Sequence, residues 1–289
     1  MLITLSVLWG GSFFFVGVAV EGLPLLTIVT LRVGLAAVIL WVTAFTIGLR
    51  PPRELNVWIA FIGMGLLNNV IPFSLIVWGQ TQIASGLASI LNAATPIFTV
   101  VVAGLLLPDE RLTKLKAVGV IVGFMGVAVM IGLPAIEGKG ALPQSAVILA
   151  TISYAFAGVF GRRFRKMHIN PLVTAAGQVT ASTLLLIPLT LSVDGLFAVA
   201  KADVTVLAAV LSLAFFSTAI AYVLYFKILE SAGATNVLLV TLLVPISAIL
   251  LGVLFLNEDL KAVHYLGMFM IALGLTAIDG RLWERKVIF

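Results

Sequence analysis

Two stretches of the 289-residue chain, ERLTKLKAVGVIVGFMG at residues 110–126 and EDLKAVHYLGMFMIALG at residues 258–274, carry the same residues at the same spacing. Each contains Glu-x-Leu, then six residues and a glycine, then six more residues and a second glycine. Upstream, Pro96 lies 14 residues before the first glutamate and Pro245 lies 13 residues before the second. A proline, an acid and two glycines in near register predict that the chain consists of two copies of one unit.

The whole chain is too apolar for a soluble protein. It is 62% hydrophobic and 10% charged, whereas soluble domains are about 45–50% apolar and about 25% charged. A soluble domain of this size needs a polar surface, and a transmembrane barrel needs alternating polar and apolar residues rather than long apolar runs. The composition predicts an all-α integral membrane protein, and it excludes a soluble globule, a disordered chain and a nucleic-acid-binding protein.

Ten segments are long and apolar enough for a membrane-spanning helix, which needs about 20 residues. We place them at residues 2–20, 24–48, 57–79, 83–107, 115–133, 141–160, 171–191, 204–226, 232–256 and 262–280. The first segment is a weak candidate for a signal peptide, because no basic region precedes it and no clear cleavage site follows it. We therefore expect ten transmembrane helices joined by short loops, with no soluble domain.

The basic residues fall mainly on one side of this arrangement. Of the 17 lysines and arginines, 13 lie on the side of the two termini, three lie on the other side, and Arg32 lies inside a segment. Because basic loops stay in the cytoplasm, both termini are expected to be cytoplasmic. The net charge of +5 is then a sign of basic loops rather than of nucleic-acid binding.

Five segments per copy is an odd number, so the second copy enters the membrane from the opposite side. We expect one repeat at residues 1–134, an inverted repeat at residues 141–280 and a cytoplasmic tail at residues 281–289. Inverted repeats are typical of secondary transporters, which bind substrate near the midplane and expose the site to each side in turn.

The chain resembles the drug/metabolite transporter superfamily in its ten-helix form with two EamA-type repeats. The residues that carry the resemblance are Trp9-Gly10, Pro24, Arg32 and the two repeated proline, Glu-x-Leu and glycine patterns. The resemblance implies a carrier of the bacterial inner (plasma) membrane that exports small metabolites, and it extends to aromatic amino-acid exporters of the YddG type. In the second half, Tyr154 stands in place of the tryptophan and Gln178 stands about where Arg32 would repeat, so the role of Arg32 is not duplicated.

Polar and aromatic residues deep in the segments are candidates for a water-filled cavity, because a polar side chain that faces lipid is costly. We predict that the central cavity is lined by segments 1, 3, 4, 6, 8 and 9. The predicted substrate-binding residues are Trp9, Ser12, Phe13, Asn68, Asn69, Trp78, Ser89, Asn92, Tyr154, Gln178, Tyr222 and Thr241. The alternative for a serine or threonine is a hydrogen bond to its own backbone that only supports helix packing.

Prolines and glycines inside the segments predict special backbone geometry. Pro72, Pro96 and Pro245 each remove a backbone donor and predict kinks, which are either fixed or hinges. Close helix packing is predicted at Gly119, Gly123, Gly126, Gly267 and Gly274, within the chain rather than in a dimer.

Arg32 is the only charged residue well inside a segment. It is able to bind a carboxylate, and it is equally able to anchor its neighbours. Because the resembling family carries arginine here for varied substrates, we predict a structural role.

The residues that are missing also limit the chemistry. The chain has no cysteine, and its two histidines, His168 and His264, lie near loops. We therefore expect no metal, no cofactor and no enzymatic activity. No carboxylate lies deep in a segment, so no obvious proton or sodium carrier is expected. A phosphate-bearing substrate requires several basic residues, whereas a neutral or zwitterionic one does not.

These observations predict a secondary transporter that exports small neutral or zwitterionic metabolites, most of all aromatic and other amino acids. Its expected partners are the lipid bilayer and the small-molecule substrate, without nucleic acid. We expect a monomer and leave a dimer open. Two alternatives remain, namely an exporter of drugs and lipophilic cations, and a receptor or channel-like membrane protein.

Overall fold

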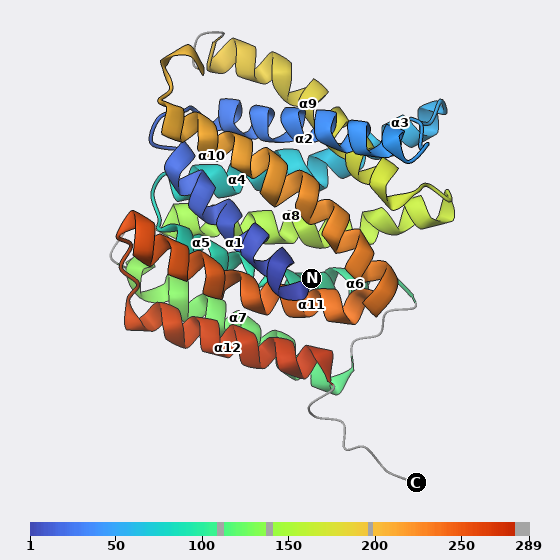
Figure 1. The fold of residues 1–289 in the computed structure, drawn as a ribbon. Coiled ribbons are helices and arrows are strands. Elements are labelled where there is room, and N and C mark those ends of the chain that lie inside the picture. Colours follow the sequence, from blue (N-terminus) through green and yellow to red (C-terminus); the bar gives the residue numbers. More distant parts are fainter. Residues whose placement is uncertain (109–112, 137–140, 196–198, 281–289) are drawn as a thin grey trace.

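The computed structural model describes residues 1–108, 113–136, 141–195 and 199–280, and within these ranges the chain is helical without strands. The all-α class is therefore confirmed for the described residues. The helices run roughly along one common direction, and α1 begins toward the same end of the bundle at which α12 stops (Figure 1). The motif residues Glu110 and Leu112, and the predicted tail at 281–289, lie outside the described residues.

The first half of the chain supplies seven α-helices and one π-helix. They are α1 (Leu2–Ala19), α2 (Leu25–Thr46), α3 (Leu55–Gly65), the π-helix η1 (Leu66–Val70), α4 (Ile71–Gln80), α5 (Ser85–Asn92), α6 (Thr95–Leu106) and α7 (Lys114–Ile136). The second half supplies α8 (Ala141–Lys166), α9 (Pro171–Val193), the 3-10 helix η2 (Val199–Lys201), α10 (Val204–Ala214), the π-helix η3 (Phe215–Ile220), α11 (Ala221–Leu256) and α12 (Ala262–Asp279).

Among the described residues, eight helical stretches are long and apolar enough to cross a membrane, and a shorter apolar helix covers Leu243–Leu256. Their outer faces carry large exposed apolar side chains such as Val38, Leu105, Leu184 and Leu254. Such a surface is stable against lipid and unstable against water. The count of ten spans and the inverted orientation of the second half remain predictions.

One predicted boundary is wrong. Residues 162–166 were expected to lie between segments 141–160 and 171–191, but α8 continues through them to Lys166. Arginine and lysine favour helices and are stabilised at a helix C-terminus by the helix dipole, and the Arg163 guanidinium carbon lies 3.5 Å from the centre of the Phe160 ring. The predicted segment 204–226 agrees with a candidate span at Val204–Tyr225, although α11 stays helical between this segment and the next. The α11 ribbon continues α10 and then turns back along the bundle (Figure 1).

Two of the three prolines predicted to kink helices coincide with changes in helix geometry. Pro72 is the second residue of α4, directly after the π-helix η1, and Pro96 is the second residue of α6, after a break that separates it from α5. Pro245 lies inside α11. Because proline lacks the backbone donor that an uninterrupted helix needs, these positions are natural interruptions. That they act as hinges remains a prediction.

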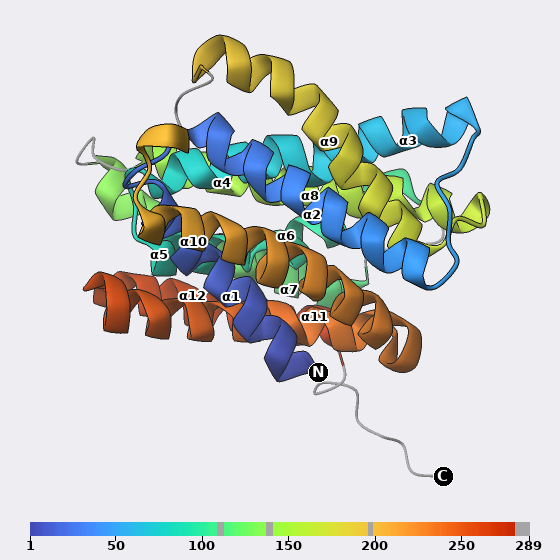
Figure 2. The same ribbon diagram turned by 45° about the horizontal axis from the view of Figure 1, so that its top comes forward.

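The two halves of the chain pack crosswise. Helix α7 pairs with α12 along one flank of the bundle, and α2 pairs with α9 along the opposite flank (Figures 1 and 2). Between these pairs, α1 of the first half packs on α10 and α11 of the second, while α8 of the second half packs on α4 and α6 of the first. Each half therefore completes its core only with helices of the other half.

Glycines make the α7–α12 contact close. A Cβ atom on Gly119 would lie 2.6 Å from the Gly274 carbonyl oxygen, and one on Gly274 would lie 2.6 Å from the Gly119 carbonyl oxygen. One on Gly126 would lie 2.8 Å from the Gly267 carbonyl oxygen. The first glycine of each repeated pattern thus faces the second glycine of the other pattern. Gly123 faces the side chain of Ile97 on α6 instead.

Candidate substrate site

Both π-helices carry polar residues into the interior of the bundle. Asn68 and Asn69 belong to η1, and Ser217 and Thr218 belong to η3. A π-helical turn holds more residues than an α-helical turn, and such turns occur frequently at functional sites. Adjacent asparagines that would diverge on an α-helix both reach the same tyrosine here.

Four neutral side chains form a connected hydrogen-bond cluster, which we call the amide–tyrosine cluster: Asn68, Asn69, Gln178 and Tyr222. The Asn68 side-chain nitrogen Nδ2 donates to Gln178 Oε1 at 3.1 Å and to the Tyr222 hydroxyl at 3.2 Å. The Tyr222 hydroxyl donates to Asn69 Oδ1 at 3.2 Å. Asn69 and Gln178 are buried, whereas Asn68 and Tyr222 are partly accessible. All four are predicted site residues that come from three separate spans.

Backbone groups near the π-turn hold the cluster in place. Asn69 Nδ2 donates to the Ser182 hydroxyl at 3.1 Å, and that hydroxyl lies 2.7 Å from the Gln178 carbonyl oxygen and 3.2 Å from that of Gly65. The Ser153 hydroxyl donates to the Leu67 carbonyl oxygen at 2.7 Å. A Cβ on Gly65 would lie 2.8 Å from the Gln178 carbonyl oxygen, so the approach of α3 to α9 requires glycine here.

Arg32 lies near the cluster as a buried cation. Its Nε donates to the Thr218 hydroxyl at 3.1 Å, and its guanidinium carbon lies 3.8 Å above the centre of the Phe73 ring. Tyr154 and Tyr222 lie close enough to interact with its charge. In the part of the chain that the structure describes, no carboxylate pairs with it. Arg32 therefore connects α2 to η3 and α4 through a hydroxyl and a ring.

The aromatic residues predicted for the site lie in the apolar interior. The rings of Trp9 and Tyr225 lie 5.8 Å apart, and Phe13 is buried in the apolar core. Tyr154 contacts two apolar clusters, one built around α5 and α6 and the other around α2 and α9. Tyr154 thus stands at the boundary between the two main parts of the core.

Other predicted site residues do not join the amide–tyrosine cluster. The Ser89 hydroxyl donates to the Gly86 carbonyl oxygen one turn back, which is the alternative geometry expected of a serine. Ser12 is buried in α1, Trp78 is half-buried near the end of α4, and Thr241 is half-buried in α11. Asn92 ends α5, and its Oδ1 is buried without a hydrogen-bond partner among the described residues.

Some residues of the interior were not predicted as site residues. Phe73 contacts Arg32, and Ser182 contacts Asn69. A phenylalanine or a single serine inside an apolar segment is not by itself a sign of a site residue. Glu258 lies between the predicted segments 232–256 and 262–280 and was not named as a site residue, although its place in the repeated Glu-x-Leu pattern was a signal that it has a specific contact.

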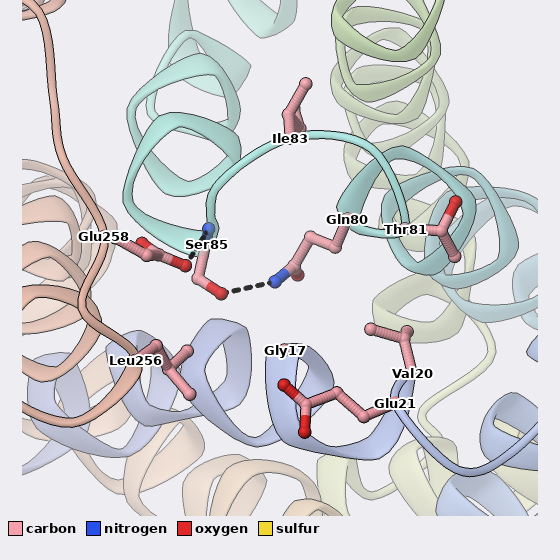
Figure 3. Close-up of a pocket in the computed structure, with 9 residues that line it drawn as sticks. All are labelled: Gly17, Val20, Glu21, Gln80, Thr81, Ile83, Ser85, Leu256 and Glu258. Atoms are coloured by element: carbon pink, nitrogen blue, oxygen red, sulfur yellow. Dashed lines mark hydrogen bonds between the residues drawn. The ribbon is translucent and has the colours of Figure 1, made fainter.

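A separate cavity of about 340 Å³ lies where α1 and α4 end and α5 begins (Figure 3). It is lined by Gly17, Val20, Glu21, Gln80, Thr81, Ile83, Ser85, Leu256 and Glu258. Among the residues that the structure describes, no three histidine, cysteine or acidic side chains are grouped to hold a metal ion.

Comparisons with known proteins agree with this architecture. The sequence profile of the EamA-like transporter family matches residues 1–132 and 143–278. The uncharacterized transporter YoaV of Bacillus subtilis is 25% identical over 99% of this chain and 98% of its own length. A probable amino-acid metabolite efflux pump of Escherichia coli is 25% identical over 97% of this chain and 94% of its own.

The inner membrane transporter YedA of Escherichia coli, itself uncharacterized, is 25% identical over 99% of this chain and 92% of its own length. One solved crystal structure, described only as that of a protein, superposes with a TM-score of 0.70 at 17% identity, covering 99% of this chain and 98% of that one. The structural likeness shows the shared fold.

Proposed function

The chain belongs to the EamA-like transporter family, and we propose that it exports small neutral or zwitterionic metabolites, chiefly aromatic and other amino acids, by alternating access. The family is one of multi-pass membrane transporters rather than enzymes. The name of one relative, a probable amino-acid metabolite efflux pump, supports the substrate class. The relative YedA supports an inner-membrane location.

The observation that carries the proposal is the amide–tyrosine cluster. Its amides and hydroxyl are donors and acceptors without charge, which suit the carboxylate and ammonium groups of an amino acid in one site. Asn68 and Tyr222 are partly accessible and are able to contact the substrate. The buried Asn69 and Gln178 hold the Asn68 and Tyr222 side chains in position. The nearby rings of Trp9 and Tyr154 supply an apolar surface for a side chain.

The charge inventory also favours this substrate class. Within the described part of the chain, Arg32 is the cation that lies next to Tyr222, and its contacts with Thr218 and Phe73 support the predicted structural role. A phosphate-bearing metabolite would need several such groups. A permanently cationic drug would be repelled by Arg32 unless a carboxylate lay near it.

The crosswise packing of the two halves supports alternating access. Two equivalent, inverted units would place their last helices antiparallel and pair the first glycine of one with the second glycine of the other. The pairs Gly119–Gly274 and Gly126–Gly267 have this relationship. The two π-helices add to it, because each follows an 11-residue helix in the third span of its half. Such units pass through two similar states that open to opposite sides.

The test is uptake of labelled phenylalanine into proteoliposomes, with and without unlabelled amino acid inside and with and without a pH gradient. We expect saturable uptake that internal amino acid stimulates and that zwitterionic amino acids, but not lipophilic cations, compete away. Absence of uptake by a verified folded sample would overturn the amino-acid proposal. Inhibition by lipophilic cations would favour a drug exporter, and a steady conductance would favour a channel.

Leucine at position 92 should reduce this uptake about tenfold, the effect of losing one hydrogen bond to substrate at about 1.4 kcal/mol. The buried Oδ1 of Asn92 has no partner among the described residues, so it is available to a bound molecule. Asn56→Leu is the matched control, because Asn56 is exposed and its Oδ1 accepts only from the adjacent Val57 nitrogen. Wild-type uptake by folded Asn92→Leu would remove Asn92 from the site.

A further inference from the structure

The cavity shown in Figure 3 lies at the end of the bundle that the distribution of basic residues predicts to be external. Four elements meet there: the end of α1, the end of α4, the start of α5 and the loop between α11 and α12. In Figure 3 the Glu258 carboxylate and the Gln80 amide both point toward Ser85 at the start of α5. Neither contact is part of the amide–tyrosine cluster.

Glu258 binds the first turn of α5 with both carboxylate oxygens. Its Oε1 accepts from the Ser85 backbone nitrogen at 2.6 Å, and its Oε2 accepts from the Gly86 backbone nitrogen at 2.9 Å. The first N–H groups of a helix have no partner within the helix, and the helix dipole favours a negative charge beside them. The contact therefore joins the α11–α12 loop to α5 through a charge-assisted pair of hydrogen bonds.

Glycines leave the space that this contact needs. A Cβ on Gly252 would collide with the Glu258 carboxylate, and one on Gly86 would lie 3.5 Å from Oε2 and 3.3 Å from Leu260 Cδ1. Leu260 is the leucine of the repeated Glu-x-Leu pattern. In this copy, the glutamate of the pattern binds the start of α5 and the leucine packs beside it.

Gln80 adds a second connection at the same place. Its Nε2 donates to the Phe13 carbonyl oxygen at 2.8 Å and to the Ser85 hydroxyl at 2.9 Å, which joins α4 to α1 and α5. These two acceptors fix the orientation of the amide. Its Oε1 is left buried without a donor among the described residues, in a side chain that is 6% exposed.

We propose that Glu258, Ser85, Gly86 and Gln80 form a latch that closes this end of the transport pathway, and that release of α5 by Glu258 opens it. An ionised carboxylate accepts hydrogen bonds about twice as strongly as a neutral group. The charge of Glu258 therefore holds the start of α5, and a neutral side chain at this position holds it less strongly.

The surroundings of Glu258 allow α5 to respond when the latch is released. The carboxylate borders the cavity rather than closely packed side chains alone. The other charged group that lines the cavity is Glu21 at the end of α1, while Asp259, Lys261 and His264 follow Glu258 in the chain. Helix α5 is eight residues long and is separated from α6 by a break at residues 93–94, so it is able to move as a short unit.

A single-cysteine experiment tests the latch directly, because the chain contains no cysteine. Ser89→Cys places a thiol on α5 at a position that is fully buried while the latch is closed. The measurement is its rate of labelling by a membrane-impermeant maleimide. The rate is divided by that of Val193→Cys, an exposed position at the same end, to correct for differences in reagent delivery between samples.

We expect slow labelling of the Ser89→Cys parent. Adding Glu258→Gln should raise the labelling rate about tenfold, since it weakens two charge-assisted bonds. Asp259→Asn is the matched control and should behave like the parent. Should the Gln variant fail to fold, Glu258→Asp keeps the charge on a shorter side chain and should also label faster than the parent.

Parent-like labelling of Glu258→Gln would overturn the latch. The inference rests on the proposed function only in assuming a pathway through the bundle, and labelling needs no substrate. If labelling behaves as expected while phenylalanine is not transported, the latch stands and the substrate proposal fails.

Discussion

Leucine in place of Gly119 should unfold the α7–α12 flank and cause a large loss of stability. Even a Cβ atom at this position lies 2.6 Å from the backbone carbonyl of Gly274 and 3.0 Å from the Ile278 nitrogen, neither of which can rotate away. Overpacking costs about 1–3 kcal/mol where side chains can adjust, so about 3 kcal/mol or more is expected here. The measurement is the melting temperature and the monodispersity of the detergent-purified protein.

The control for this substitution is Gly158→Leu on α8. The nearest atom to a Cβ at Gly158 is a Thr99 methyl carbon at 3.9 Å, and the residue is exposed. Leucine has a higher helix propensity than glycine by roughly 0.8 kcal/mol, so this variant should match or exceed the wild type. Equal melting temperatures for the two leucine variants would show that α7 and α12 are not in backbone contact.

Phenylalanine in place of Tyr222 should reduce transport by about tenfold or more while the fold persists. The Tyr222 hydroxyl accepts from Asn68 and donates to Asn69, so its removal leaves Asn69 Oδ1 without this donor at a fully buried position. An unsatisfied buried polar group costs about 1–3 kcal/mol, and 1.4 kcal/mol corresponds to a factor of about ten. The ring remains, so the packing around it is conserved.

Stability and transport should respond differently to this change. Polar side-chain contacts between membrane helices average about 0.6 kcal/mol, so the melting temperature should fall only slightly. Tyr265→Phe on α12 is the control, because Tyr265 is exposed on the outside of the bundle. A Tyr222→Phe protein with wild-type uptake would show that the amide–tyrosine cluster supports the fold and does not contact substrate.

The sequence predicted which polar residues lie inside the bundle but not the hydrogen bonds between them. Asn68, Asn69, Gln178 and Tyr222 were recognisable because an amide or a mid-span tyrosine is costly against lipid, and they do lie inside the bundle. Their hydrogen-bond pattern depends on which helices pack together, which periodicity within one segment does not reveal. A serine inside a segment is predicted either to line the cavity or to bond the backbone of its own helix. Ser89 does the second, because its hydroxyl donates to the Gly86 carbonyl oxygen.

Other features were beyond sequence reasoning for identifiable reasons. The π-turns of η1 and η3 carry no residue signature that distinguishes them from α-helix. The helical run of α8 through 162–166 includes Arg163, which packs over the Phe160 ring, whereas a count of charges alone places this stretch in a loop. Glu258 lies outside a span in the sequence, yet folding returns its carboxylate to the start of α5, 173 residues earlier in the chain.

The π-turns change how relatives at about 25% identity should be compared. One residue rotates an α-helix by about 100°, so the turn at Leu66–Val70 sets the direction in which Phe73 meets Arg32, and the turn at Phe215–Ile220 does the same for Tyr222. A relative with one residue fewer in either stretch would present a different face to the interior from that point onward. A single-residue gap within either π-helix is therefore a stronger sign of altered substrate selectivity than several substitutions elsewhere. This holds even when all the residues that align on either side of the gap are identical.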